Sequence, residues 1–431
     1  QLVDTTNPTV TITDDQSGKV TDADSTVQFS VTFSEAVTGF ALDDLSIVGG
    51  TGSNFVAVSS TLYTFDVTAT DDSIADITVD IAGSAAIDAN ANVSIVATQA
   101  KQQVDRTDGT LSGTAAALVT QFNNTGFSYS GDVTVTDAAT IAQLTTINAE
   151  TTGTVTYSAM TDTASNLATN TGSYVTGSIA VTVSDSTVSA SHLNTVNGLT
   201  TAAVNAAAIT SLTGSLSDVQ TAYTANTAGT ITGLGNEAVT LTDTSGAASD
   251  LNTLNAETSG IVNSASINTL TGTLSDVHTA YTANTAGTIS GLGNEAVTIS
   301  STVSSASSLA GINTGTSGDI TLNDTSAALS GTATDLQSGL SGNVTTYTGN
   351  VTVTTSTNVA MLKDINDAVS GEITLDDTST ILFGTSSDLV DAFAGTITTY
   401  TGDIVITDEP TASQLATIND SVSGDIQLND T

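Results

Sequence analysis

The stretch GDITLNDTSAALSGTATDL at residues 318–336 recurs 53 residues later as GEITLDDTSTILFGTSSDL at residues 371–389. It begins a third time as GDIQLNDT at residues 424–431. Upstream, residues 211–240 and 269–298 are identical at 26 of 30 positions, with an offset of 58. Repetition at such a period is typical of arrays in which each unit packs against its neighbours. Because the third copy is partial, we expect the sequence to be a segment of a longer polypeptide.

Each repeat contains two strand–helix elements. A glycine precedes each strand, for instance Gly371 before ITLDD and Gly402 before IVITD, and apolar residues alternate with polar ones along the strand. Helical runs such as TASQLATIND follow, with Leu415 and Ile418 three residues apart on one face. Similar strands joined by a helical crossover run parallel. The pattern predicts a parallel β-solenoid with short helices in its coils over residues 108–431, and a set of separate small α/β modules is the alternative.

The first part of the chain, residues 1–107, has a different pattern. Four runs alternate with period two: VTIT at 10–13, VQFSVTF at 27–33, LYTFDVTA at 62–69 and ITVDI at 77–81. Clusters of turn-forming residues such as DDQSG and GGTGSN separate them. Several short strands with such turns and no helical pattern favour an antiparallel β-sandwich. The fold class predicted for the whole chain is therefore mainly β.

The same region resembles a known family. The segments TNPTVTIT, FSEAVTGFALDDLSIVGGTGSNF, LYTFDVTA and AAIDANANVS are similar to the bacterial Ig-like modules strung in tandem in large surface proteins of the adhesin or surface-layer type. The family's usual Asp-x-x-Gly-Asn reads DANAN here, with Ala91 in place of glycine. VDTTNPT at 3–9 and VDRTDGT at 104–110 repeat each other at the two ends, as linkers do in a series of modules. The resemblance implies a spacer or adhesive role without catalysis, secreted or on the bacterial cell surface.

The charge of the chain restricts its partners. It has 44 acidic residues against 4 Lys plus Arg, a formal net charge of −40, so it repels both nucleic acid and anionic lipid. Calcium is the cofactor that such a composition favours, because oxygen ligands bind it. The 39% of hydrophobic residues, in periodic patterns, argues against disorder. The chain has no cysteine for disulfides or thiolate sites and no apolar run long enough for membrane insertion.

Aspartates give the candidate metal ligands. One set lies near the predicted strand ends and linkers of the first module, where clustered oxygens would bind calcium at a module junction, with solvated turns as the alternative. This set comprises Asp4, Asp14, Asp15, Asp22, Asp24 and Asp105. A second set closes the strands of the repeats. We expect each of its carboxylates to cap the helix that follows, and stacked strands would also align them in columns that cations bridge. This set comprises Asp137, Asp243, Asp324, Asp377, Asp408 and Asp430.

Catalysis is not expected. Of the two histidines, His192 and His278, the second stands where the matching repeat has Gln220, so a residue that does not titrate serves at that position. The sequence has no HExxH spacing, no GxSxG elbow and no Walker loop. So many carboxylates occur that an apparent glycosidase pair carries little information. The sequence therefore predicts a protein that is not an enzyme.

The leading hypothesis is a structural component of the bacterial cell exterior: a surface layer, sheath or extracellular filament stabilised by cations. The alternative is a stalk or spacer segment of a giant secreted adhesin, and a third class is a spacer in an exoprotein that carries an enzyme elsewhere. Self-association with other copies is the expected partnership in the first case. Cell-surface glycans are a further candidate partner.

Overall fold

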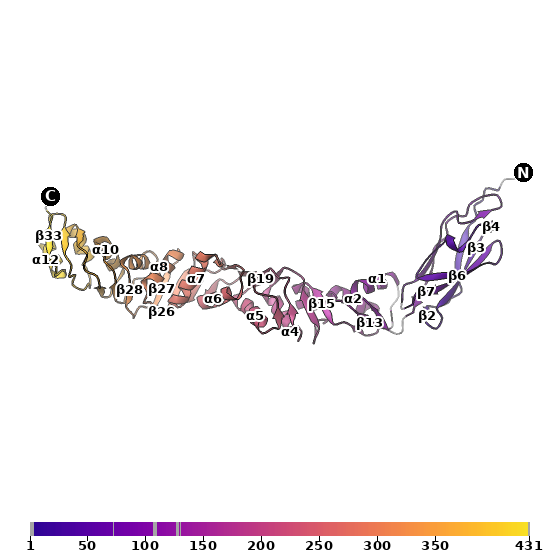
Figure 1. Ribbon diagram of the computed structural model, residues 1–431, viewed down its shortest axis with the longest axis horizontal. Helices are drawn as coiled ribbons and strands as arrows, with labels where there is room; N and C mark the ends of the chain where they lie inside the picture. The colour runs from indigo at the N-terminus through magenta and orange to yellow at the C-terminus, as the bar shows by residue number, and fades with distance from the viewer. Residues whose placement is uncertain (1–3, 72, 107–109, 126–128, 130, 430–431) are drawn as a thin grey trace. The chain divides into compact units, whose positions relative to one another are not determined.

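The computed structural model describes residues 4–71, 73–106, 110–125, 129 and 131–429. Contacts divide the chain into two compact units, Gln1–Thr182 with Leu199–Ala202 and Val183–Gly198 with Ala203–Thr431. The first unit holds the N-terminal β-sandwich and the first strand–helix elements, and the second holds the remaining strand–helix elements (Figure 1).

The N-terminal module is an antiparallel β-sandwich. One sheet has the strand order β1–β3–β7–β6 and the other β10–β8–β5, and the short pairs β4–β9 and β11–β2 complete it. All four predicted strands are confirmed, within one residue at each end. Part of the predicted linker, residues 107–109, lies outside the described residues. The elements are β1 Val10–Asp14, β2 Val20–Thr21, β3 Thr26–Phe33, β4 Val37–Thr38, the 3-10 helix η1 Leu42–Asp44, β5 Leu45–Val48, β6 Gly50–Ala57, β7 Leu62–Ala69, β8 Ile77–Ile81, β9 Ile87–Asp88, β10 Ala100–Gln102 and β11 Val104–Asp105.

Alternating side chains of β3 and β7 fill the core of the sandwich. Phe29 and Phe65 face each other in register and are stacked, with ring centroids 5.5 Å apart. Phe33, Phe40 and Tyr63 form a second group with edge-to-face contacts at 5.1–5.8 Å. Each fully buried apolar side chain of this size contributes about 1.5–3 kcal/mol. This module therefore has one shared core, held by residues far apart in the sequence.

Strands and helices alternate after the sandwich. In the first unit, the elements are β12 Thr110–Gly113, α1 Ala115–Thr125, β13 Asp132–Val135, α2 Ile141–Glu150, β14 Val155–Thr156, β15 Ala159–Asp162 and α3 Ala164–Thr169, and β16 Ala180–Val183 lies at the boundary. The second unit begins with β17 Thr187–Ser189, α4 Ala190–Leu199, β18 Val204–Asn205, β19 Ser211–Gly214, α5 Leu216–Thr227, β20 Ile231–Thr232, β21 Ala238–Leu241, β22 Ser245–Ala247, α6 Ala248–Glu257, β23 Val262–Asn263, β24 Thr269–Gly272, α7 Leu274–Ala286 and β25 Ile289–Ser290. It continues with β26 Ala296–Thr302, α8 Ala306–Gly315, β27 Ile320–Asp324, β28 Leu329–Gly331, α9 Ala333–Leu340, β29 Val351–Val353, α10 Val359–Ala368, β30 Ile373–Leu375, β31 Leu382–Gly384, α11 Ser386–Ala392, β32 Ile404–Ile406, α12 Ala412–Ser421 and β33 Ile426–Leu428.

The parallel pairing predicted for the repeats is confirmed. β29 pairs with β30, and β32 with β33, residue for residue. The prediction of a mainly β chain with a solenoid is wrong: strands and helices occur in roughly equal measure, and the described residues show no solenoid. The parallel strands lie in separate small sheets, such as β28–β29–β30 and β31–β32–β33. Strands of three residues and helices of seven to ten residues make up this part of the chain, and each of its two sheets has three strands.

Most helices of the repeats begin at a side-chain cap, although α6 follows Ala247, which provides none. The hydroxyl of Ser215, directly before α5, accepts a hydrogen bond from the amide of Asp218 at 3.1 Å. The first amide of α5, that of Leu216, donates instead to the carboxylate of Asp243 at 2.6 Å. Asp243 follows β21, which pairs in parallel with the strand that leads into α5. The end of one strand therefore caps the helix of the preceding strand–helix element.

This arrangement corrects the prediction for the strand-closing aspartates. Asp137 and Asp408 also cap the preceding helix, not the following one, by accepting from the amides of Ala115 and Ser386 at 2.7 and 2.6 Å. In-register parallel stacking causes this, because it sets each strand end beside the start of the previous helix. Asp324 and Asp377 instead accept from the amides of the serines two residues later, at 3.0 Å. Asp430 lies outside the described residues.

The glycines that precede β30 and β33 are required by close stacking. A Cβ at Gly371 would lie 2.1 Å from the carbonyl oxygen of Gly349, and one at Gly424 would lie 2.2 Å from that of Gly402. No side chain fits at such distances. Successive elements therefore approach each other backbone to backbone at this position.

Candidate functional site

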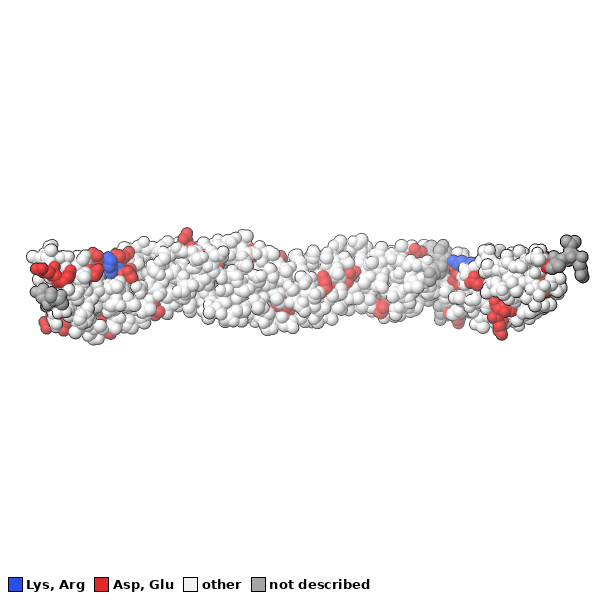
Figure 2. All heavy atoms as spheres, turned by 90° about the horizontal axis from the view of Figure 1, so that it is seen from above, with Lys and Arg blue, Asp and Glu red and all other residues white. Residues whose placement is uncertain are grey.

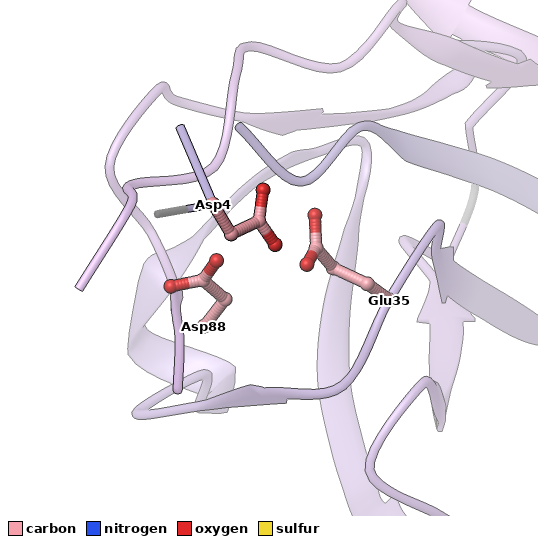
Figure 3. A group of neighbouring side chains, drawn as sticks. All are labelled: Asp4, Glu35 and Asp88. Carbon is pink, nitrogen blue, oxygen red and sulfur yellow. The ribbon is translucent and has the colours of Figure 1, made fainter. Parts of the chain in front are cut away.

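Three carboxylates converge in the Ig-like module. Oxygens of Asp4, Glu35 and Asp88 all lie within 4.8 Å of one another. The three side chains come from the segment before β1, the turn between β3 and β4, and the end of β9, and they point toward a common space (Figure 3). Three chain segments far apart in sequence therefore supply oxygens to one place.

A tight turn fixes Asp88. Its side chain is 5% exposed, and β9 pairs with β4 at this residue. One carboxylate oxygen accepts from the amides of Asn90 and Asn92, each at 2.8 Å, and the other accepts from the Asn92 side chain at 2.8 Å. Ala91 closes this turn in the left-handed region, with φ of +66°. Glycine adopts that conformation without strain, so the position suits the glycine that the resemblance to the Ig-like family implies.

Asn92 also connects the turn to Asp4. Its side-chain amide donates to the backbone oxygen of Asp4 at 3.3 Å. One carboxylate oxygen of Asp4 accepts from the amide of Thr6 at 3.0 Å. The carboxylates of Asp4 and Asp88 thus accept hydrogen bonds from protein donors with some of their lone pairs. Their other lone pairs are available to a ligand.

The electrostatics of the cluster favour a cation. Burial, together with the neighbouring charges of Asp4 and Asp88, raises the pKa of Glu35. Burial would also raise the pKa of Asp88, but the hydrogen bonds from Asn92 and Asn90 outweigh it and lower the pKa. Asp88 is therefore held ionised while the group as a whole repels further negative charge. A divalent cation would relieve that repulsion, and three carboxylates are the oxygen ligands that suit calcium.

The structure brings only one of the six predicted ligands into this group. Asp4 joins it, whereas the other five have protein partners elsewhere in the module. Asp22 and Asp105 form ion pairs with Arg106 and Lys19, with N–O distances of 3.4 and 3.6 Å. The remaining carboxylates accept hydrogen bonds: Asp14 from the amide of Gln16, Asp15 from the amide of Gln28, and Asp24 from the side chain of Gln16.

Sequence reasoning missed Glu35 and Asp88. Both lie inside the segments that carried the resemblance, FSEAVTGF and AAIDANANVS. Acidic residues inside the segments that carry the resemblance were the available signal. Over the described ranges, no other group of three acidic or histidine side chains approaches this closely.

A second kind of polar cluster occurs twice in the repeats. Tyr223 donates to the carboxylate of Glu237, and Tyr281 donates to that of Glu295. Both glutamates are fully buried, and the amide of Gly235 also donates to Glu237, at 2.9 Å. Burial, then the hydrogen bond to the glutamate, raises the pKa of each tyrosine. Each buried carboxylate thus accepts several hydrogen bonds, and these bonds hold the turn directly before the glutamate.

The N-terminal module defines a class: a small antiparallel β-sandwich of the Ig-like type. Residues 4–105 match the family described as the bacterial Ig-like domain. Domains of this family are typical of bacterial surface proteins. No curated protein matches the chain. In the part of the chain that the structure describes, every helix is too short or too polar to cross a lipid bilayer.

Proposed function

We propose that this chain is a non-catalytic structural component of the bacterial cell exterior, in a surface layer, sheath or extracellular filament. The observation that carries the proposal is the linkage between neighbouring elements, in which the aspartate after one strand caps the helix before it. Such an architecture lengthens simply by adding units. The Ig-like domain, from a family typical of bacterial surface proteins, supports an exterior location.

A structural role also accounts for the titratable groups. The chain has a net charge of −40, which keeps an extracellular polymer hydrated and makes it responsive to divalent cations. The two buried glutamates of the repeats are bound by tyrosine and backbone donors. His278 occupies the position that Gln220 fills in the matching repeat. These groups support a protein without catalytic activity.

Calcium is the proposed stabilising ion, and the group of Asp4, Glu35 and Asp88 is its proposed site. Binding there would tie the segment before β1 to the turn after β9. The N-terminal segment of the module would then be held more rigidly when the ion is bound. A ligand at one hundred times its dissociation constant stabilises the folded state by about 2.7 kcal/mol.

The alternative is a stalk or spacer of a giant secreted adhesin. The Ig-like domain favours it as well, since spacers in surface proteins use such modules. The two functions differ in partners: a filament or lattice component associates with other copies of itself, whereas a stalk stays monomeric and presents a recognition domain, for instance to cell-surface glycans. Sedimentation velocity over a range of protein concentrations, with calcium and with chelator, separates them. Association supports the structural proposal, and a monomer under all conditions contradicts it.

The calcium site has its own test. Calorimetric melting of the whole chain with calcium and with chelator should show a higher melting temperature for the Ig-like module with the ion. The double variant Glu35→Gln/Asp88→Asn should lose that difference. Asp14→Asn/Asp24→Asn is the matched control, because it also removes two charges from the same module but outside the cluster, and it should keep the calcium response. An unchanged melting temperature in the unmodified protein would rule the site out.

A further inference from the structure

A small hollow opens on the surface near the C-terminal end of the second unit. It has a volume of about 270 Å³ and lies between the start of α10, the end of β31 and the start of α11. Phe383, Lys363, Asp364 and Asp388 are among the residues that line it. An aromatic ring and charged groups thus share one recess.

Phe383 departs from the repeat at this position. It is the middle residue of a Leu-x-Gly strand, and the equivalent residues of the other copies are Ser112, Thr213, Thr271 and Ser330. In the preceding copy, Ser330 pairs with Thr352, whereas Phe383 pairs with Val405. The ring of Phe383 is nevertheless 62% exposed. An exposed aromatic residue where every other copy has a small polar one is not explained by packing of the core.

The charges around the hollow are predominantly negative. Lys363 is the only Lys or Arg in residues 183–431, and it is already paired with Asp391 and Asp367, at 3.1 and 3.8 Å. The hydrogen bond to Asp391 is the main cause that raises the pKa of Lys363. Lys363 therefore stays positively charged, and the carboxylates of its two partners offset that charge. On the face shown in Figure 2, acidic side chains surround the basic patch in the C-terminal part of the chain, while much of the remaining surface is uncharged.

Two carboxylates in the wall of the hollow, those of Asp364 and Asp388, accept hydrogen bonds from neutral side chains. Asp364 accepts only from the neutral side chain of Gln337, at 2.6 Å, among the hydrogen bonds found for the described residues. Asp388 accepts from the hydroxyl of Thr385 at 2.8 Å, which is likewise neutral. Neither donor carries a charge, and Lys363, which interacts electrostatically with Asp388, is the cation that lines the hollow.

We infer that this hollow binds a cationic side chain of a basic polypeptide partner, with the guanidinium of an arginine over the ring of Phe383 and beside Asp364 and Asp388. A cation is attracted to the face of an aromatic ring, and arginine does so most often. Its planar fork also matches carboxylates. Four carboxylates surround the single lysine at this hollow, which disfavours anionic ligands. This inference goes beyond the structural role proposed above and does not depend on it.

The test uses the whole chain and a probe peptide, Gly-Arg-Gly-Arg-Gly-Arg-Gly with blocked termini, in isothermal titration at fixed ionic strength. Phe383→Ser restores the residue of the preceding copy and leaves the net charge unchanged, so it should weaken binding about two- to fivefold. Phe383→Trp should strengthen binding, because tryptophan offers the best face for a cation. The matched control is Leu428→Ser, which removes another exposed apolar side chain that does not line the hollow.

The outcomes separate a site from general attraction between charges. Loss in the serine variant and gain in the tryptophan variant, with the Leu428 variant unchanged, support the inference. Equal affinity in all four proteins means that the peptide binds by net charge alone and overturns it. Failure of the unmodified chain to bind also overturns it. If the serine variant does not fold, the tryptophan variant alone decides.

Discussion

The Ig-like module and the strand–helix repeats bury apolar residues in different ways. In the module, residues of distant strands meet in one aromatic core, as Phe29 and Phe65 do. In the repeats, each strand pairs with the next similar strand, as Val351 does with Ile373, and thin layers of leucine, isoleucine, valine and alanine are buried between neighbours. The module is therefore expected to unfold as a whole, whereas damage in the repeats should stay near its origin.

The largest effect should come from the aromatic core. Replacing Phe65 by alanine removes a fully buried ring stacked on Phe29, and should cost about 3–5 kcal/mol. The matched variant is Leu251→Ala, which empties a fully buried position on α6. Hydrogen exchange should show the first variant opening the whole module with the repeats unaffected, and the second opening only elements next to α6. Exchange throughout the repeats in the second variant would contradict the comparison.

A smaller loss of stability is expected when a side chain is added at one of the stacked glycines. Gly371→Ala would place a methyl group 2.1 Å from the carbonyl oxygen of Gly349, so the backbone must shift. Overpacking of this kind costs about 1–3 kcal/mol. Gly198→Ala is the control, since a Cβ there meets no atom within 4 Å. Thermal unfolding followed by circular dichroism should show a loss in the first variant only, and equal melting of the two would refute the requirement for close stacking.

The caps between neighbouring elements should each contribute about 1 kcal/mol. Asp243→Ala leaves the first amide of α5 without its partner and should destabilise the second unit by that amount. The chain itself supplies the rescue, because Ser301 accepts from the amide of Leu274 at the equivalent place, at 3.0 Å. Asp243→Ser should therefore recover much of the loss in denaturant unfolding. If serine and alanine are equally damaging, the carboxylate acts through its charge and not as a cap.

Local pattern predicted much of this fold, because alternation and helical spacing depend on near neighbours. The strands of the sandwich followed from runs such as the one at 27–33, and the parallel pairing of the repeats followed from similar strands on either side of a helix. The direction of the aspartate caps did not follow, because it depends on which helix lies beside a strand end once the strands are stacked. The meeting of Asp4 with Glu35 and Asp88 depends in the same way on loops that only the closed sandwich brings together.

The smallest expected effect lies in the turn that holds Asp88, where Ala91 replaces the glycine that is usual in bacterial Ig-like modules. Ala91 has a φ of +66° and is exposed, so a glycine there loses no packing and removes the strain of a left-handed alanine. The gain of about 1–2 kcal/mol from relieved strain is partly offset by the greater freedom of glycine in the unfolded chain, which leaves a net stabilisation of about 0.5–1 kcal/mol. Ala89→Gly in the same turn is the control, because Ala89 is also exposed but is not among the residues with positive φ. This substitution should destabilise the module by a similar amount. Calorimetry of the Ig-like transition should therefore show shifts of opposite sign, and shifts of the same sign would mean that the conformation of residue 91 is not the origin of the strain.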